Sequence, residues 1–294
     1  MLHTLIKRVF SAVVFMLLLS GCMPTSIAPH LKPIAAYTHE NLAAKQMKVS
    51  APILVRIFKK ESELEVWKEK DDGSYHLFRT YPICKWSGEL GPKLKQGDKQ
   101  APEGFYKVRA GHMNPRSQYY LSFNLGYPNA YDRSYGRTGK HLMVHGDCSS
   151  AGCYAMTDAL MEEIYLLARE AFKGGQKYIP VHAFPFRMTE ENLARHKKHK
   201  WIKFWQNLAE GYRDFEISRK SPKVHVCGRR YVFNAKFKNP RAKINARWAC
   251  PSYEKQAPEV YFGDANVQVS DYKKQFSYTP ESLFSKQDDA GIGL

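Results

Sequence analysis

The sequence has no hydrophobic run long enough to cross a bilayer comfortably, since a transmembrane helix needs about 20 consecutive apolar residues. The apolar stretch from Val9 to Leu19 is shorter and follows Lys7 and Arg8, which is the pattern of a secretory signal. Internal repeats are absent, and so is low-complexity composition over most of the chain. With 44% hydrophobic residues in 294, the chain is predicted to be globular and exported.

Acidic residues are scarce, because 28 Asp and Glu face 45 Lys and Arg, which gives a net charge of +17. Such a balance favours anionic partners. In an exported protein the anionic polymers and lipid head groups of the envelope are favoured over nucleic acid, and no nucleic-acid partner is expected. The densest basic run, Arg195 to Lys200, is predicted to be the solvated face of a helix.

Cysteines are few, and the first of the six has a separate interpretation. Leu19-Ser20-Gly21-Cys22 resembles a bacterial lipobox, so residues 1–21 are predicted to be a lipoprotein signal peptide and Cys22 the lipidated residue. Met23 stands where an inner-membrane lipoprotein typically has Asp. The expected location is therefore the periplasm, with a lipid anchor in the outer membrane.

The other cysteines are Cys84, Cys148, Cys153, Cys227 and Cys250. Export allows disulfides to persist, and an odd number leaves at least one cysteine free or paired between molecules. The pair Cys227 with Cys250 is favoured, because both lie in one C-terminal segment. The other pairings stay open, including a disulfide between Cys148 and Cys153.

The order of patterns predicts a mixed α+β, β-rich protein with a small C-terminal appendage. A proline-containing tether is expected over 22–50, a catalytic domain over 51–190, a helical and strand extension over 191–263 and a polar tail over 264–294. Strands are predicted at 53–58, 63–68, 75–81, 105–108, 119–124, 178–184, 224–226 and 231–233. Apolar periodicity predicts helices over 160–171, stopped by Gly174, and over 193–212.

Candidate chemistry lies in one short stretch, from His141 to Met156. His145 ends an apolar run, and Cys153 follows Gly152 eight residues later in the chain. Cysteine attacks as a thiolate, and His145 is predicted to act as its base. A low pKa of Cys153 would then allow alkylation by iodoacetamide well below pH ~8. Backbone N–H groups around Gly152 are candidates for an oxyanion hole, so acyl transfer through a thioester is the predicted reaction.

Other interpretations of this stretch are weaker. Ser150 is disfavoured as a nucleophile because Gly152-Cys153 occupies the position where the turn presents the attacking group. A zinc site at His145, Cys148 and Cys153 lacks a fourth ligand at motif spacing. Cys153 could also be a buried structural residue.

These residues resemble the L,D-transpeptidase (YkuD-type) catalytic domain family. His145-Gly146 and Ser150-Ala151-Gly152-Cys153 match its motif, and the stretch from Gly97 to Tyr106 is similar to a second block. The blocks Ser87–Lys93 and Phe184–Met188 look like its YafK-like branch. The resemblance implies a β-sandwich or barrel catalytic domain and no metal or organic cofactor. It also implies that a backbone carbonyl, not an acidic side chain, orients the imidazole of His145.

The implied substrate is a peptidoglycan stem peptide, attacked by Cys153 after the L-centre of meso-diaminopimelate. Many family members have Arg where Ala155 stands and His where Ala151 stands, so substrate contacts must come from elsewhere. The predicted substrate-binding residues are Arg137, Lys140, Ser150, Tyr154 and Arg187.

The short spacing and the two alanines leave the reaction open between transfer and hydrolysis. Transfer by an L,D-transpeptidase is the main hypothesis. The first alternative is hydrolysis of a crosslink or of the bond that joins an outer-membrane lipoprotein to peptidoglycan. The second alternative is a non-catalytic module that holds anionic envelope polymer on its basic surface.

Overall fold

The computed structural model describes residues 27–261, and the chain divides into two compact units with the boundary between Lys32 and Pro33. In the first unit the described residues form one 3-10 turn, η1 (Pro29–Leu31), with proline at its start. The predicted signal peptide, the lipidation site Cys22 and the tail from 264 lie outside the described residues. All that follows concerns the second unit.

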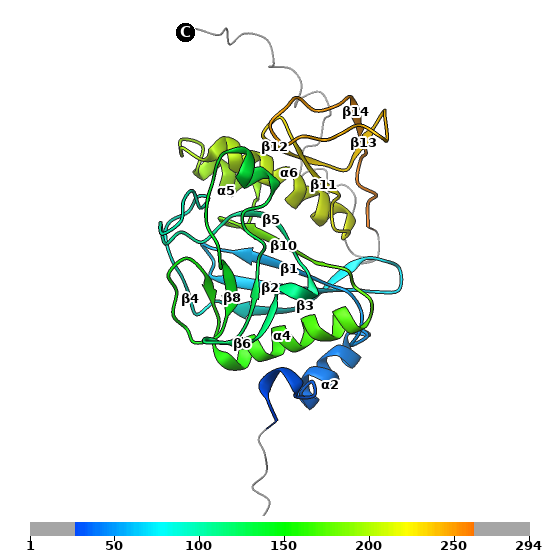
Figure 1. The fold of residues 1–294 in the computed structure, drawn as a ribbon. Helices are drawn as coiled ribbons and strands as arrows, with labels where there is room; N and C mark the ends of the chain where they lie inside the picture. Colours follow the sequence, from blue (N-terminus) through cyan, green and yellow to red (C-terminus); the bar gives the residue numbers. More distant parts are fainter. Residues whose placement is uncertain (1–26, 262–294) are drawn as a thin grey trace, which may run out of the picture. The chain divides into compact units, whose positions relative to one another are not determined.

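Two five-stranded sheets form the framework of this unit (Figure 1). The first, sheet A, has the order β3-β2-β1-β10-β5, with β1 and β10 parallel and the other pairs antiparallel. Its strands are β1 (Ile53–Phe58), β2 (Glu63–Glu69), β3 (Tyr75–Pro82), β5 (Gly104–Val108) and β10 (Ile179–Phe184). These strands agree with the predicted ones, and the predicted turn between β2 and β3 contains Gly73 at a positive φ of 76°.

Sheet B has the order β4-β9-β8-β7-β6, and only β8 and β9 run parallel. Its strands are β4 (Lys85–Trp86), β6 (Met113–Ser117), β7 (Tyr120–Asn124), β8 (Met143–His145) and β9 (Tyr154–Ala155). The short turns η2 (Ala110–His112) and α3 (Ala130–Ser134) flank β6 and β7 in the chain. The predicted mixed α+β, β-rich class is confirmed.

The two faces of sheet A are covered by different helices (Figure 1). Val55 and Ile57 pack into a core with Ile164 of α4 (Asp158–Lys173). Side chains on a strand alternate between faces, so Phe58 points to the other side, where it packs with Leu208 of α6 (Ile202–Ser218). The predicted helix ending before Gly174 is confirmed as α4.

The single helix predicted over 193–212 is wrong, because the basic run divides it. α5 (Glu190–Arg195) ends at His196, and α6 begins at Ile202. Between them His196 stacks on Phe186 with ring centroids 4.4 Å apart, and His199 stacks on Trp205 at 4.3 Å. The run is therefore a turn held by its histidines and not one solvated helix face.

The predicted tether over 22–50 is also wrong in its described C-terminal part. Residues 36–44 form helix α2 (Ala36–Ala44), with Leu42 in the same core as α4. The hydroxyl of Thr38 donates a hydrogen bond of 2.7 Å to Glu163 Oε1 of α4. Burial of Leu42 and this hydrogen bond hold the segment on the domain.

The C-terminal strands form two hairpins, β11 (Val224–Cys227) with β12 (Arg230–Phe233), and β13 (Ala235–Phe237) with β14 (Tyr253–Lys255). Tyr231 and Phe233 of β12 belong to the α6 core, so this part of the predicted extension contributes to the interior. Across 27–261, none of the helices combines the length and apolar character needed to span a membrane.

Candidate active site

His145 and Cys153 lie on neighbouring segments of the chain, at the end of β8 and directly before β9. In the parallel pair of β8 and β9, His145 is opposite Ala155 and Val144 is opposite Tyr154. Cys153 directly precedes β9, and its Sγ accepts from the N–H of Met143, which lies two positions before His145 on β8. Val144 and Tyr154 point into the core. The pairing of β8 with β9 thus brings the predicted nucleophile next to the strand that carries the predicted base.

The imidazole of His145 is oriented by a backbone carbonyl, as the resemblance implied. Its Nδ1 lies 2.6 Å from the oxygen of Gly146, and a carbonyl oxygen only accepts, so Nδ1 carries the hydrogen and Nε2 is left as the free base. His145 is only 3% exposed, and the ring of Tyr119 lies over it at 4.9 Å. Burial lowers the pKa of His145, which keeps it neutral.

Gly146 has a steric reason to be glycine that the sequence did not reveal. A Cβ there would come within 2.4 Å of the Asp158 carboxylate and 3.1 Å of the oxygen of Tyr119. The same Asp158 oxygen accepts a hydrogen bond of 2.8 Å from the backbone of Asp147. The start of α4 and the carbonyl that orients His145 therefore pack together without space for a side chain.

Cys153 is half-buried and is the only free cysteine among residues 27–261. Its Sγ accepts from the Met143 N–H at 3.4 Å and donates toward the oxygen of His141 at 3.5 Å. Burial raises the pKa of the thiol, opposed by the Met143 N–H and by the charge of Lys93. This direction is opposite to the low pKa expected from the sequence, and it favours a neutral thiol and a neutral imidazole in the resting protein.

Ser150 organises the turn before Cys153. Its Oγ accepts from the N–H groups of Gly152 at 3.4 Å and Cys153 at 3.2 Å, and it donates to the oxygen of Cys153 at 2.8 Å. Gly152 has a φ of 125°, a conformation that other residues rarely adopt. Two backbone donors therefore converge on one acceptor position beside the nucleophile, which the hydroxyl of Ser150 occupies in this structure.

A disulfide between Cys84 and Cys148 fastens this turn to the chain between β3 and β4. It excludes the pairing of Cys148 with Cys153 and removes Cys148 from the set of possible zinc ligands. The second disulfide, Cys227 to Cys250, is as predicted. Asp147 and Cys148 both have positive φ values, 66° and 41°, which cost conformational energy outside glycine. The first disulfide thus helps to hold a strained turn that leads to Cys153.

Replacing both Cys84 and Cys148 with alanine is expected to lower the free energy of unfolding by about 2–4 kcal/mol, since the bridge closes a long loop. We also expect kcat/KM of the folded variant to fall about tenfold, because the turn before Cys153 is no longer held by a covalent bond. Urea unfolding and single-substrate kinetics measure the two effects. The matched control replaces Cys227 and Cys250, whose bridge lies outside the turn that leads to Cys153. Equal kinetics in the two double variants would contradict a role of the first bridge in holding the turn.

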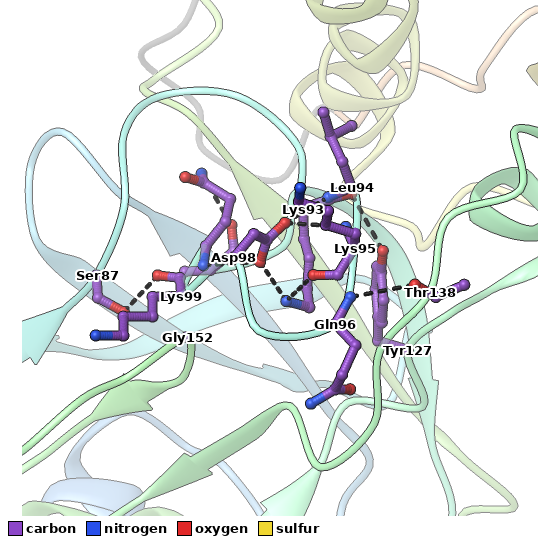
Figure 2. A network of polar contacts seen from close by, with 12 residues as sticks. Ser87, Lys93, Leu94, Lys95, Gln96, Asp98, Lys99, Tyr127, Thr138 and Gly152 are labelled. Carbon is purple, nitrogen blue, oxygen red and sulfur yellow. Dashed lines mark hydrogen bonds and ion pairs between the residues drawn. The ribbon is translucent and has the colours of Figure 1, made fainter.

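The glycine-rich loop between β4 and β5 lies against the catalytic turn. Ser87 Oγ donates to the oxygen of Lys99 at 2.8 Å and lies 3.2 Å from Ser150 Oγ. Figure 2 shows the network behind it, in which Lys93 pairs with Asp98 and the Tyr127 hydroxyl donates to the Lys93 oxygen at 3.1 Å. Asp98 also accepts from three backbone N–H groups of its own loop. Lys93 is the cation that this network holds near Cys153.

A buried ion pair anchors the same loop to sheet A. Lys59 Nζ lies 3.0 Å from Glu103 Oε1, and both side chains are fully buried. Lys59 also donates to the oxygens of Glu89 and Gly91, and Glu103 accepts from the Trp205 indole at 2.9 Å. Every charge is met by a partner, as a buried pair requires. The loop beside Cys153 is therefore positioned by the core.

The pH dependence of alkylation tests the resting state of Cys153. Because the pKa of the thiol is raised, labelling by iodoacetamide is expected to keep increasing above pH ~8.5 instead of levelling off below it. Lys93→Met removes a charge that favours the thiolate, so its labelling at pH 8 is expected to be several-fold slower. Asp98 keeps its backbone partners in this variant. Lys95→Met, an exposed neighbour, is the control, and a labelling midpoint below pH 8 would contradict the assignment.

Of the predicted substrate-binding residues, Arg137 and Tyr154 are structural. Arg137 is 6% exposed and donates to Asp132 at 2.9 Å, with the ring of Tyr131 5.1 Å away. Tyr154 is fully buried, and its hydroxyl donates to the oxygen of Pro102 at 2.6 Å. Charges and hydroxyls satisfied in the interior have no capacity left for a substrate.

Arg187 forms ion pairs within the protein, whereas Lys140 is exposed and forms none among the described residues. Arg187 is paired with Glu63 and with Glu65, the latter at 2.8 Å, and its guanidinium lies over the ring of Phe58. The structure does not connect it to the Cys153 turn. Lys140 is exposed and immediately precedes His141, whose oxygen accepts from the Cys153 thiol. Lys140 therefore remains a candidate cation at the site. Lys93, which the sequence did not single out, is buried and paired with Asp98, and it acts on the Cys153 thiol through its charge.

Comparison with known proteins gives a consistent result. The YkuD family model, described as the L,D-transpeptidase catalytic domain, matches residues 53–181. YafK of Escherichia coli K12, an L,D-transpeptidase by its name, is 43% identical over 221 residues, which are 75% of this chain and 89% of YafK. YafK of Escherichia coli O157:H7 matches equally.

Solved structures are more distant. Pgp2 of Campylobacter jejuni, a helical cell shape determining protein, is 19% identical with a TM-score of 0.37 over 67% of this chain and 80% of Pgp2. Bd1075 of Bdellovibrio bacteriovorus is 17% identical with a TM-score of 0.34 over 60% of this chain and 74% of Bd1075. On the identity with YafK and the match to the family model, this chain belongs to the L,D-transpeptidase (YkuD) family.

Proposed function

We propose that this protein is an exported cysteine acyl-transfer enzyme of peptidoglycan remodelling that acts at meso-diaminopimelate of stem peptides. One observation supports this most strongly. Cys153, the one free thiol of the described residues, contacts the backbone of β8, the strand that carries His145, and the Nε2 of His145 is left free by the hydrogen bond at Nδ1. A thiol and a neutral imidazole together suffice for acyl transfer.

The reaction begins from the neutral pair. His145 Nε2 takes the proton of the Cys153 thiol as Sγ attacks the carbonyl carbon after the L-centre of meso-diaminopimelate. The C–N bond then breaks, and the imidazolium returns its proton to the departing amine, which leaves a thioester on Cys153. An acceptor amine or a water, deprotonated by His145, attacks the thioester and regenerates the thiol.

The carbonyl oxygen that becomes negative in this step needs hydrogen-bond donors. The N–H groups of Gly152 and Cys153 converge on the position now taken by Ser150 Oγ. In our proposal the substrate oxygen replaces that hydroxyl, because a charged oxygen is the stronger acceptor. Lys140 is the proposed cation for substrate carboxylates.

Hydrolysis is the alternative fate of the thioester, and the environment of Ala155 favours it. Many family members have Arg at this position, whereas Ala155 is buried and contributes no charge. A site that binds the acceptor's carboxylate more weakly lets water attack a larger fraction of the thioester molecules. The bond cleaved would then be a crosslink or the link between a lipoprotein and peptidoglycan. We further propose the envelope location and the lipid anchor at Cys22 expected from the sequence.

Product mass separates these reactions. The purified protein is incubated with disaccharide-tetrapeptide muropeptides and, separately, with lipoprotein-linked peptidoglycan. Transfer yields crosslinked dimers or exchange of the terminal residue for an added amino acid, whereas hydrolysis yields tripeptides or released lipoprotein. Transfer products from the muropeptides alone would support the main proposal, and released lipoprotein would support the alternative. Absence of all these products would contradict an enzymatic role on stem peptides.

A further inference from the structure

A large groove lies beside sheet A, and neither His145 nor Cys153 lines it. Its volume is about 1050 Å³, at the upper end of what ligand sites enclose. One wall is the edge strand β5, and the others come from residues 124–133, from the segment that enters β10, and from residues 221–226 beside β11. The catalytic turn from His141 to Cys153 contributes nothing to it. The groove is therefore a second candidate binding site.

The walls are strongly basic. Five exposed cations line the groove, and none of them forms an ion pair within residues 27–261: Lys107, Arg109, Arg133, Lys177 and Lys223. Glu69 is the one acidic side chain in the lining, and it interacts with the hydroxyl of Tyr75. Most cations elsewhere in the core of this unit are matched by carboxylates, as Lys59 is by Glu103. The groove thus has an excess of positive charge with nothing in the described residues to neutralise it.

The interior of the groove holds polar groups without partners. His182 is 2% exposed, and its Nδ1 makes no hydrogen bond among the described residues. A buried polar atom left unpaired is costly, and a ligand that reaches it would recover that cost. His225 also lines the groove, and its pKa is lowered by burial and by the nearby charges of Lys107 and Lys223. The charges of Lys107 on β5 and of Lys223 on a different wall therefore both reach the His225 side chain inside the groove.

The edge of sheet A adds backbone groups. The N–H and oxygen of Phe105 face away from β10, because they bond Tyr231 and Asn129. Groups of alternate residues on a strand face the same way, so the backbone of Lys107 also points outward to the open edge. Its N–H has no partner among the described residues. An extended peptide can pair with such an edge, whereas a compact anion cannot use it.

We infer that this groove binds an extended peptide that carries several carboxylates, and that the peptide is a stem peptide of peptidoglycan. The source rests on the proposed function, since a stem peptide combines carboxylates with an extended backbone. Cations spread over separate walls fit charges spaced along a chain better than a single phosphate group. The groove would hold the protein on its polymer while Cys153 acts at another position.

Binding to a catalytically inactive form tests this inference. Affinity of the Cys153→Ala protein for a disaccharide-tetrapeptide muropeptide is measured by calorimetry, with and without the further substitutions Lys107→Glu and Lys223→Glu. We expect these two changes to weaken binding at least about tenfold. Each one replaces a positive charge that attracts the carboxylates of the ligand with a negative charge that repels them. The control is Lys197→Glu with Lys198→Glu, an equal change of charge on an exposed turn away from the groove. Thermal unfolding verifies that each variant is folded.

Two further ligands identify what is recognised. A muropeptide with amidated carboxylates is expected to bind at least about tenfold more weakly to the unmodified groove, and lipopolysaccharide is expected not to compete. Equal affinity in the groove and control variants, equal affinity for the amidated ligand, or binding of lipopolysaccharide alone would overturn the inference. Labelling of Cys153 by a carbapenem in the Lys107→Glu, Lys223→Glu protein stays unchanged in our proposal. The binding measurements test the groove, and the carbapenem labelling tests the catalytic assignment, so an error in one proposal can be distinguished from an error in the other.

Discussion

Cys153→Ala is expected to lower kcat/KM on muropeptides by at least about 10³-fold, since no other group can form the acyl-enzyme. Other thiols cannot substitute, because the remaining four cysteines of the described residues are in disulfides. A carbapenem adduct, visible by mass spectrometry on the parent protein, disappears from the variant. The fold tolerates the change, since Sγ makes only two long hydrogen bonds.

Ser149→Ala is the matched control for this substitution. Ser149 is exposed in the same turn and makes no side-chain hydrogen bond within the described residues, so its loss leaves turnover within about twofold. If Cys153→Ala kept the activity of this control in both assays, Cys153 would not be the nucleophile. Sacculus binding that survives the loss of Cys153 while no turnover is detected in the parent would instead favour a binding module.

His145→Gln is expected to lower kcat by about 10²–10⁴-fold, the usual contribution of a general base. The pH profile adds a readout that a structural role would not give. Since burial lowers the pKa of His145, the neutral base persists as pH falls, and the acid limb of the parent profile has its midpoint below pH 6.5. In the variant the limb moves upward, because the rate then follows ionisation of the thiol, whose pKa is raised.

The control is His141→Gln. The side chain of His141 is exposed, and only its backbone oxygen contacts the Cys153 thiol, so the exchange leaves both rate and profile nearly unchanged. An acid limb with the same midpoint in the parent and in His145→Gln would show that His145 is not the titrating base. A large effect of His141→Gln would reverse our preference between the two histidines.

Most of the framework could be predicted from sequence because it depends on local patterns. The strands of sheet A and the helix α4 show the period of two and the period of 3.6 that half-buried strands and helices require. The motif from His145 to Cys153 was likewise visible, since a strand end, a turn and a glycine before the nucleophile are contiguous. The disulfide between Cys227 and Cys250 followed from their proximity in the chain.

Segments with weak local signals were predicted wrongly. The helix α2 has almost no amphipathic pattern, so residues 36–44 resembled a linker until their contacts with α4 were known. The basic run near His196 carried a helical pattern, but the stacking of its histidines on Phe186 and Trp205 favours a turn. Tertiary packing outweighs local propensity in both segments.

By itself the sequence determined the strands of sheet A, the family and the two residues proposed for the chemistry, because each depends on neighbours in the chain. Only the tertiary structure decided which charges are free. Arg137 and Arg187 are cations like Lys140 in sequence, yet Asp132 pairs with the first, and Glu63 and Glu65 of a distant strand pair with the second. The partner of Cys148, the burial that raises the pKa of Cys153 and the unpaired cations of the groove were likewise hidden. Burial and long-range pairing set the energy of a charge, and a linear sequence records neither.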